Sequence, residues 1–295
     1  MINIRDCIYK YHLSIIAVCF YPNYVILYGK KNQYLLKNRN TDSKRLFSYF
    51  DSIQYPYYLS LLNDYGDFYE LYPYYDEQTD DIHLKVKVML QALCLLHGKT
   101  IYTEELSDDE FLKIYDTLKE KINHCFHYYL ELRDSSEQSE FRADYYLFLK
   151  NSSKLFHLLF LAKEYLESWY QNKMATIRKV FSIHNLALNN FCFCKKSFFI
   201  DYQFAYSDCL IADLVSFYKE NALTFEISSL IDYYWSKIEF SKSELLLFYS
   251  SISIPDEIIL NDNIYENTVK LHYLIEYIDK TIVFLEENKK NEETD

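Results

Sequence analysis

Hydrophobic and polar positions alternate in short blocks over the first part of the chain. Three runs of β-branched and aromatic residues are separated by the turn signals Pro22–Asn23 and Gly29–Asn32. These runs lie at residues 14–21, 24–29 and 33–37. Such a pattern is typical of antiparallel strands joined by tight turns, and a further pair of runs flanks Asn63–Gly66. We predict a sheet of about five antiparallel strands over residues 1–75, with one short helix at 46–53.

From Asp76 onward the apolar positions recur at helical spacing. Ser107 followed by Glu110 predicts a capping box at the start of one helix, which is expected to continue to about residue 133. Further helical patterns cover residues 82–97, 140–172, 213–220, 226–238, 243–252 and 264–287. The sequence thus predicts an α+β protein with a sheet domain at 1–75, a helical domain at 76–287 and a polar tail at 288–295.

One segment, Phe181 to Asp213, interrupts the helical part. It contains a polar loop and two short apolar runs, Asn190–Cys194 and Ser197–Ile200, which are joined by a lysine turn and predict a hairpin. Asp201 follows the second run directly. A polar loop, a hairpin and an acid at a strand end are typical of phosphoryl-transfer sites, because metal and phosphates need ligands held on rigid elements.

Composition excludes several classes of function. With 31 basic and 43 acidic residues the net charge is −12, which argues against a general nucleic-acid or anionic-membrane surface. The chain has only three glycines, Gly29, Gly66 and Gly98, so it contains no glycine-rich phosphate-binding loop. The apolar run near the N-terminus is about eight residues long, whereas a membrane-spanning helix needs roughly 20.

The seven cysteines are scattered and form no CxxC pair, which indicates reduced thiols in a cytoplasmic compartment. Cys192 and Cys194 lie two apart in a predicted strand and therefore share one face. They are expected to be small buried residues, and the alternative is that they flank a metal.

Taken in order, these features resemble the protein-kinase-like fold in its small-molecule branch, which includes aminoglycoside and choline phosphotransferases and spore-coat kinase-like proteins. The loop SIHNLALNNF is similar to the HGDxxxxN catalytic loop of that family, and FFIDYQFA is similar to its IDFxxA pattern. Lys37, at the end of the third predicted strand, matches the lysine of the N-lobe. The resemblance implies two lobes, a small antiparallel-sheet N-lobe and a larger helical C-lobe that contains the catalytic-loop hairpin.

The resemblance also implies roles for individual residues. Lys37 would face the nucleotide, and the segment from Glu70 to Glu77 resembles the hinge that binds adenine through its backbone. The residues expected at the site are Lys37, Glu70 and Tyr72 for ATP, Asn190 and Asp201 for Mg²⁺, and Asp213 for ordering the catalytic loop from behind. The sequence leaves structural alternatives open: a solvated lysine at position 37, a turn cap at 201, a loop-shaping amide at 190 and a helix cap at 213.

The catalytic base departs from the family pattern. When Asn190 is placed on the metal-binding asparagine of the family, the position of the catalytic aspartate falls on Asn185. In the family pattern one residue separates the histidine from the catalytic aspartate, whereas His184 directly precedes Asn185. No carboxylate occurs between Phe181 and Cys194. An amide cannot accept a proton at neutral pH. His184 could substitute as the base or serve only as a structural hydrogen-bonding group.

The lysine partner departs from the family pattern as well. The helix predicted after Lys37 contains no glutamate, so Asp42 and Asp51 are the candidates for the usual ion-pair partner of this lysine. The loop expected to cover the nucleotide, Phe20–Asn23, contains no glycine.

Three hypotheses follow from these matches and departures. The first is a degenerate kinase-like protein, or pseudokinase, that keeps a partial pocket for nucleotide and Mg²⁺ and acts as a binding or scaffold module for a protein partner. The second is an active ATP-dependent phosphotransferase that acts on the hydroxyl of a small molecule, since positioning and electrostatics carry most of the catalysis. The third is a structural, coat-like protein in which exposed tyrosines support assembly.

Overall fold

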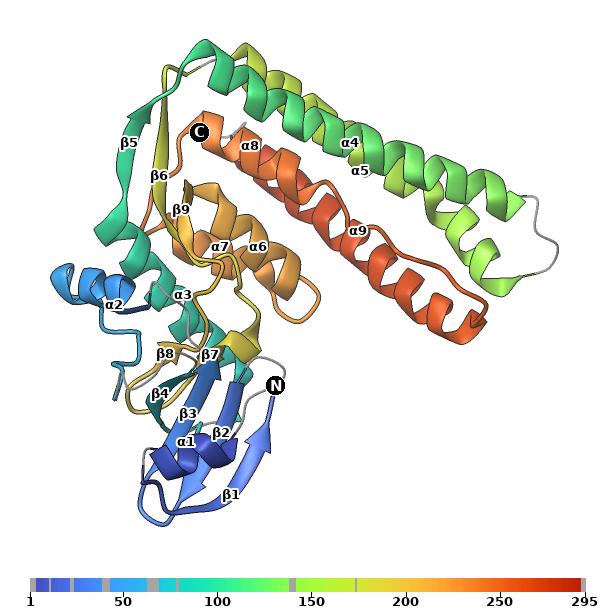
Figure 1. Ribbon diagram of the computed structural model, residues 1–295. Coiled ribbons are helices and arrows are strands. Elements are labelled where there is room, and N and C mark those ends of the chain that lie inside the picture. Colours follow the sequence, from blue (N-terminus) through green and yellow to red (C-terminus); the bar gives the residue numbers. More distant parts are fainter. Residues whose placement is uncertain are drawn as a thin grey trace. The chain divides into compact units, whose positions relative to one another are not determined.

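A computed structural model describes residues 4–10, 12–21, 24–38, 43–62, 69–77, 80–137, 142–172 and 174–292. The chain divides into two compact units (Figure 1). The first, here the sheet unit, consists of Met1–Lys99 and Asn185–Ala205; the second, here the helical unit, consists of Thr100–His184 and Tyr206–Asp295. The hairpin segment groups with the N-terminal sheet although about 85 residues of chain separate the two, so the units follow packing rather than chain order.

The sheet unit is built on four antiparallel strands in the order β1-β2-β3-β4. These are β1 (Ile15–Phe20), β2 (Tyr24–Gly29), β3 (Gln33–Asn38) and β4 (Tyr69–Tyr74). The predicted three-stranded meander is confirmed. Gly29 is needed at the turn between β2 and β3, because a Cβ there would lie 2.7 Å from the carbonyl oxygen of Asn32.

A fifth strand, predicted before Asn63, is not among the described strands of this sheet, although the N–H of Leu62 donates to Leu71 O at 2.9 Å. Tyr58 and Leu59 are both buried, so this segment lacks the alternation of a half-buried strand. The carbonyl of Tyr57 pairs with the hairpin segment instead, since it accepts the N–H of Phe199 at 3.2 Å. The predicted turns at Pro22–Asn23 and Asn63–Gly66 lie outside the described residues.

The two faces of this sheet pack against different elements. On one face, Val25, Leu27, Leu36 and Leu71 form a cluster against Ile4 of α1 (Ile4–Lys10), a helix that the sequence did not predict. On the other face, the cluster extends from the sheet to the hairpin of β7 (Phe191–Cys192) and β8 (Phe198–Phe199) and to α2 (Ser43–Ser52). Its buried members are Ile26, Leu35, Leu59, Tyr72, Cys192, Cys194 and Phe198. Packing against this second face holds the hairpin beside the sheet. The remaining helix of this unit is α3 (Ile82–Thr100).

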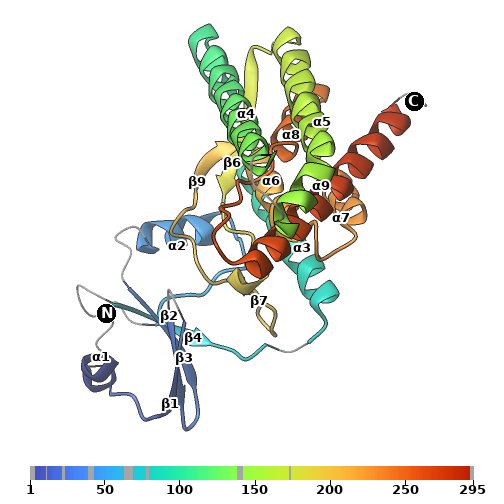
Figure 2. The same cartoon turned by 90° about the vertical axis from the view of Figure 1, so that its right-hand side faces the viewer.

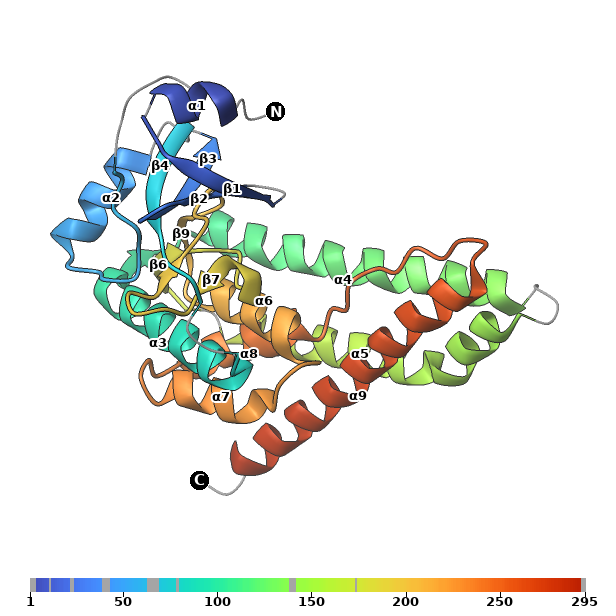
Figure 3. The same ribbon diagram turned by 90° about the horizontal axis from the view of Figure 1, so that it is seen from below.

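The helical unit contains a second antiparallel sheet that the sequence did not predict. Its strands are β5 (Tyr102–Glu105), β6 (Thr176–Ser182) and β9 (Tyr206–Cys209), in the order β5-β6-β9. The helices are α4 (Asp108–Glu137), α5 (Ala143–Gln171), α6 (Ile211–Asn221), α7 (Ile227–Trp235), α8 (Lys242–Ile252) and α9 (Ile264–Glu292). The long helices α4 and α5 run side by side, and α8 and α9 also pack on α5 (Figures 2 and 3).

Local signals explain where two of these helices begin. Ser107 Oγ accepts the N–H of Glu110 at 3.3 Å, and Glu110 Oε2 accepts the N–H of Ser107 at 2.9 Å, which confirms the predicted capping box. Ser241 and Glu244 form a second one at the start of α8. At the other end of the unit, α9 continues to Glu292, so the predicted polar tail is helical up to that residue. Glu, Lys and Asn side chains do not prevent a helix from continuing, and most of those present favour it.

Candidate active site

Lys37 lies at the end of β3 and forms an ion pair with Asp201. Its Nζ is 2.7 Å from Asp201 Oδ1 and donates to the carbonyl of Ile200 at 2.8 Å. Both side chains are largely shielded, with 14% and 9% of their surface exposed. Lys37 is therefore not a solvated surface lysine; the packing of the hairpin against the sheet brings it to the acid that ends β8.

Asn190 fixes the backbone on both sides of the hairpin. It ends the short 3-10 helix η1 (Leu188–Asn190), and its Oδ1 accepts the N–H of Asp201 at 2.8 Å. Its Nδ2 donates to Asp201 O at 3.1 Å and to Asn185 O at 2.8 Å. The amide thereby ties the loop to the start of the Asp201 segment. Asn190 shapes the loop and at the same time places an amide oxygen next to Asp201.

One oxygen of Asp201 has the properties of a metal ligand. Oδ1 is used by Lys37 and by the N–H of Gln203 at 3.2 Å. Oδ2 is buried and finds no hydrogen-bond partner among the described residues. Leaving a buried carboxylate oxygen unpaired is costly, and a cation would remove that cost. Mg²⁺ prefers oxygen ligands and usually keeps several waters, so one carboxylate and one amide oxygen fit it, with phosphates completing the shell.

Glu70 and Tyr72 lie within β4, before the hinge rather than in it. Glu70 is the direct cross-strand neighbour of Lys37, and the two side chains therefore share one face of the sheet. Glu70 and Tyr72 are both buried, and the hydroxyl of Tyr72 donates to Glu70 Oε2 at 2.7 Å. The sheet thus provides a carboxylate beside Lys37 that the sequence did not identify as its partner.

Only one of the two acids that the sequence offered as partners for Lys37 lies among the described residues, and it bonds elsewhere. Asp51, on α2, accepts a hydrogen bond from the hydroxyl of Tyr58. Asp42 lies outside the described residues. The register of β3 with β4 places Glu70 opposite Lys37, although the two residues lie 33 positions apart in the sequence.

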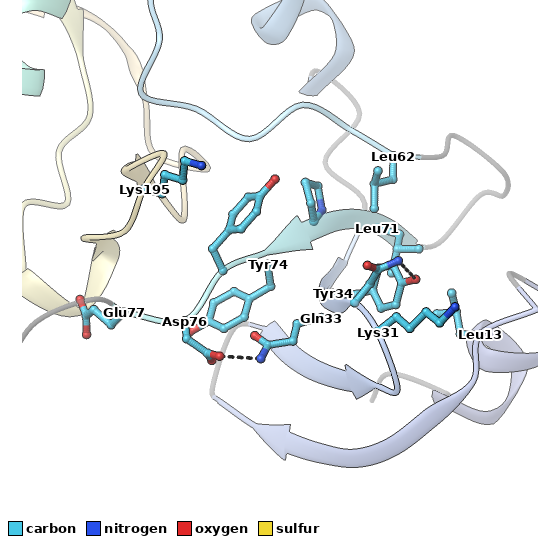
Figure 4. A pocket seen from close by; sticks show the side chains of 13 residues that line it. Leu13, Lys31, Gln33, Tyr34, Leu62, Leu71, Tyr74, Asp76, Glu77 and Lys195 are labelled. Carbon is cyan, nitrogen blue, oxygen red and sulfur yellow. Dashed lines mark hydrogen bonds between the residues drawn. The ribbon is translucent and has the colours of Figure 1, made fainter.

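The end of β4 leads into a segment with a cavity of about 910 Å³ beside it (Figure 4). Gln33 Nε2 donates to Asp76 Oδ2 at 2.6 Å and ties this segment to β3. Tyr74, Asp76 and Glu77 line the cavity, but neither Lys37 nor Asp201 does. Lys37 and Asp201 are thus not part of the lining of this cavity.

The cysteine pair in the hairpin is not arranged as a metal site. Cys192 Sγ points to the carbonyl of Tyr75 at 3.4 Å, and Cys194 Sγ to that of Lys196 at 3.1 Å. A hydrogen bond with Cys194 and burial raise the pKa of Cys192 above its usual range. Among the described residues, no three His, Cys, Asp or Glu side chains cluster as metal ligands. The pair belongs to the core.

Asp213 orders the catalytic loop within the helical unit. It lies in the first turn of α6 and is fully buried. Its Oδ1 accepts the N–H of His184 at 2.7 Å, and its Oδ2 accepts the N–H of Ile183 at 2.8 Å. These charge-assisted bonds fix the two residues that precede Asn185. The Asp213 carboxylate therefore holds the backbone at positions 183 and 184.

Replacing Asp213 with alanine is expected to destabilise the protein by about 3 kcal/mol, because two buried N–H groups lose a charged acceptor. Urea unfolding would measure this change. Asp232→Ala is a suitable control, since Asp232 is exposed on α7. Equal midpoints for the two variants would contradict the role of Asp213.

The backbone at His184 supports the register of the loop. His184 has a φ of 59°, in the left-handed region that favours glycine. In the HGDxxxxN pattern the residue before the aspartate is glycine, and His184 occupies that place. Asn185, which follows, lies five residues before Asn190, as the catalytic aspartate does in the pattern. The conformation thus agrees with the register in which Asn185 stands where the family pattern has its aspartate.

The imidazole of His184 lies against two residues of β9 that sequence reasoning missed. It stacks on Tyr206 with a centroid distance of 4.2 Å and an interplanar angle of 18°. Its Nε2 is 3.5 Å from Asp208 Oδ2 and is buried without a hydrogen-bond partner among the described residues. Burial and the negative charge of Asp208 raise the pKa of Tyr206. No local pattern identifies either residue, because they reach His184 only through the pairing of β9 with β6.

Solved structures similar to this chain cover almost all of it. An aminoglycoside phosphotransferase from Alicyclobacillus acidocaldarius subsp. acidocaldarius has 13% sequence identity and a TM-score of 0.60, over 94% of this chain and 90% of that one. A spectinomycin phosphotransferase, solved with ADP and spectinomycin, has 10% identity and a TM-score of 0.58, over 96% of this chain and 97% of that one. The choline kinase LicA from Streptococcus pneumoniae has 13% identity and a TM-score of 0.48, over 97% and 98%.

The chain has the fold of the small-molecule phosphotransferases. This confirms the predicted kinase-like α+β fold, with a small antiparallel sheet at the N-terminus and a helical C-terminal part. No protein-family model matches the chain, and no curated protein matches it at a significant level. The phosphotransferase fold is therefore established by structure, at a sequence identity too low to carry function with it.

No helix in the described part of this phosphotransferase-like chain is long and apolar enough to cross a membrane.

Proposed function

We propose that this protein is a kinase-like binding module that takes up Mg²⁺ and a nucleotide and has lost its catalytic base. The observation that carries the proposal is the ion pair between Lys37 and Asp201, which leaves the buried Oδ2 of Asp201 without a hydrogen-bond partner among the described residues and able to take a cation. The spectinomycin phosphotransferase of similar structure was solved with ADP, which supports a nucleotide ligand here.

In this proposal four residues of the sheet unit, Lys37, Glu70, Asn190 and Asp201, have distinct roles. The Lys37 ammonium would pair with phosphate oxygens of the nucleotide, while Glu70 beside it would keep the lysine oriented. Asp201 and Asn190 would hold Mg²⁺, which neutralises charge on the phosphates when it is bound. The Asn190 amide keeps Asp201 in place through both backbone groups of that residue.

The proposed loss of activity rests on Asn185. A side-chain amide cannot take the proton of an attacking hydroxyl at neutral pH, and a positioned base contributes about 10²–10⁴-fold to rate. Typical kinases turn over at roughly 1–100 per second. We therefore expect γ-phosphate transfer or hydrolysis well below about 1 per second, measured as ADP release with Mg-ATP. Turnover in the range of ordinary kinases would contradict the proposal.

A second candidate function is an active phosphotransferase that uses His184 as its base. The observation that favours it is the buried Nε2 of His184, 3.5 Å from the carboxylate of Asp208, because a catalytic base is commonly oriented by a third group of this kind. Under this hypothesis His184→Gln should lower turnover by about 10²–10⁴-fold and leave nucleotide affinity unchanged. Unchanged turnover in that variant would leave only the first proposal.

The tyrosines lie both in the core and at the surface, so their number alone does not favour the coat-like hypothesis. Several tyrosines are fully buried, and they serve as core residues rather than as a surface for assembly. They include Tyr55, Tyr129, Tyr218 and Tyr234. The six cysteines that the structure describes are free thiols.

A further inference from the structure

The helical unit contains a cavity of about 170 Å³ that no predicted site residue lines. Its lining comes from the strands β5, β6 and β9, the first turn of α4, the last turn of α5, the first two turns of α8 and the residues next to them. All of these elements belong to this one unit. An apolar cavity of about 150 Å³ can hold a molecule such as benzene. The cavity is therefore of the size that accepts a single aromatic ring.

Apolar side chains form most of the surface of this cavity, and they are Leu106, Phe111, Trp169, Met174, Ile177 and Leu247. The buried rings of Phe111 and Trp169 stack on each other, with a centroid distance of 4.5 Å and an interplanar angle of 23°. Met174 adds a thioether, a group that makes favourable contacts with aromatic rings. An aromatic guest would gain from these groups beyond the burial of its own surface.

Among the described residues, two charged side chains line the cavity, Arg178 of β6 and Glu244 of α8, and they bind each other. Arg178 Nε donates to Glu244 Oε1 at 2.8 Å, and Arg178 Nη2 donates to Glu244 Oε2. The same Nη2 donates to the carbonyl of Glu239 at 2.7 Å. This pair carries no net charge, and separating its members to serve a charged ligand would be costly because Glu244 is buried.

The other polar groups of the lining are uncharged. They are the hydroxyls of Thr103, Thr176, Ser241 and Ser243 and the thiol of Cys209. Burial raises the pKa of that thiol to about 12, so it stays protonated at neutral pH. None of the buried polar side-chain atoms that lack a partner in the described part of the chain belongs to this lining. The cavity thus has no group that requires an ion or an ordered water.

We propose that this cavity binds an uncharged small molecule through a single aromatic ring. Its volume admits one ring, its stacked rings and thioether favour an aromatic guest, and its neutral ion pair gives no advantage to either sign of charge. The inference goes beyond the proposed function, because neither Lys37 nor Asp201 takes part and the binding requires no nucleotide.

Three probes of similar size test this, namely toluene, benzoate and benzylammonium, which share one ring and differ in charge. The full-length protein, labelled with ¹³C at its methionine methyl groups, gives few signals because the chain has only three methionines. Met174 lines the cavity, whereas Met89 is buried on α3 in the sheet unit and serves as the internal reference. An aromatic ring beside the methyl group of Met174 shifts its resonance, and Met174→Leu identifies that signal.

We expect toluene to shift the Met174 signal in a saturable way, with a Kd of about 1 mM or lower, and to leave the Met89 signal unchanged. Benzoate and benzylammonium should each bind at least about tenfold more weakly, because a charge placed in this cavity finds no free counter-charge.

A pair of threonine variants locates the binding in this cavity. Thr103 lies at an exposed position of β5 and lines the cavity, so Thr103→Trp should place an indole in it and weaken toluene binding by at least about tenfold. The variant should keep the melting temperature of the wild type, because strands accept aromatic residues well. Thr117→Trp is the control, since Thr117 is exposed on α4 and lines a neighbouring cavity but not this one.

Several outcomes would overturn the inference. They are a Met174 signal that millimolar toluene leaves unchanged, equal or tighter binding of either charged probe, and toluene binding that Thr103→Trp does not weaken. Loss of binding in the Thr117→Trp control instead would also overturn it, because toluene would then occupy the neighbouring cavity. Because no nucleotide is present, none of these results bears on the proposed Mg-ATP site of Lys37 and Asp201.

Discussion

Replacing Asn185 with aspartate is expected to raise the rate of phosphoryl transfer from Mg-ATP by about 10²–10⁴-fold. The register of the loop supports this expectation, since Asn185 follows the residue with a positive φ and lies five residues before Asn190. The bonds from Asp213 fix the two residues before it. The introduced carboxylate would accept the proton of the attacking water or hydroxyl, which an amide cannot do.

The gain can be measured as ADP release, with water as the acceptor. Asn189→Asp is the matched control, because Asn189 lies in the same loop, is exposed and would add the same charge away from the base position. We expect this control to leave the rate unchanged. If Asn185→Asp were no faster than the control, the absence of a base would not be what limits transfer.

The second large effect is expected for Asp201→Asn, which should remove the stabilisation of the protein by Mg-ATP. At a nucleotide concentration of 100 Kd, a ligand that binds only the native state stabilises it by about 2.7 kcal/mol. The variant loses the charge that the metal requires and the ion pair that holds Lys37. Chemical denaturation with and without Mg-ATP would measure the difference.

Asp116→Asn is the control for this experiment, since Asp116 is exposed on α4 and its substitution removes the same charge. Lys37→Met should resemble Asp201→Asn, because it removes the other half of the ion pair. If Mg-ATP stabilised the Asp201→Asn variant as much as the wild type, the nucleotide would bind elsewhere.

Local signals were enough to predict much of this fold. The strands β1 to β3 and the long helices were predicted because each has an apolar periodicity that can be recognised in a single sequence. Asp201 could be identified as a candidate site residue because it directly follows a short apolar run that ends a predicted strand. The capping box at Ser107 and Glu110 is local too, since it needs only two residues three positions apart.

Features that depend on pairing between distant segments were missed. All four residues of β5 are exposed, so this strand has no hydrophobic alternation to reveal it. Glu70 was expected in a hinge, and only the register of β3 with β4 places it opposite Lys37. Tyr206 and Asp208 reach His184 because β9 pairs with β6, a contact that local patterns do not encode.

The measurement that tests the central claim most directly is a thermal-shift titration of the wild-type protein with ATP, with and without Mg²⁺. The account predicts a melting temperature that rises with nucleotide concentration only when Mg²⁺ is present, by about 5 °C near 100 Kd. Unchanged melting at millimolar Mg-ATP would contradict the claim that Lys37 and Asp201 form a nucleotide site.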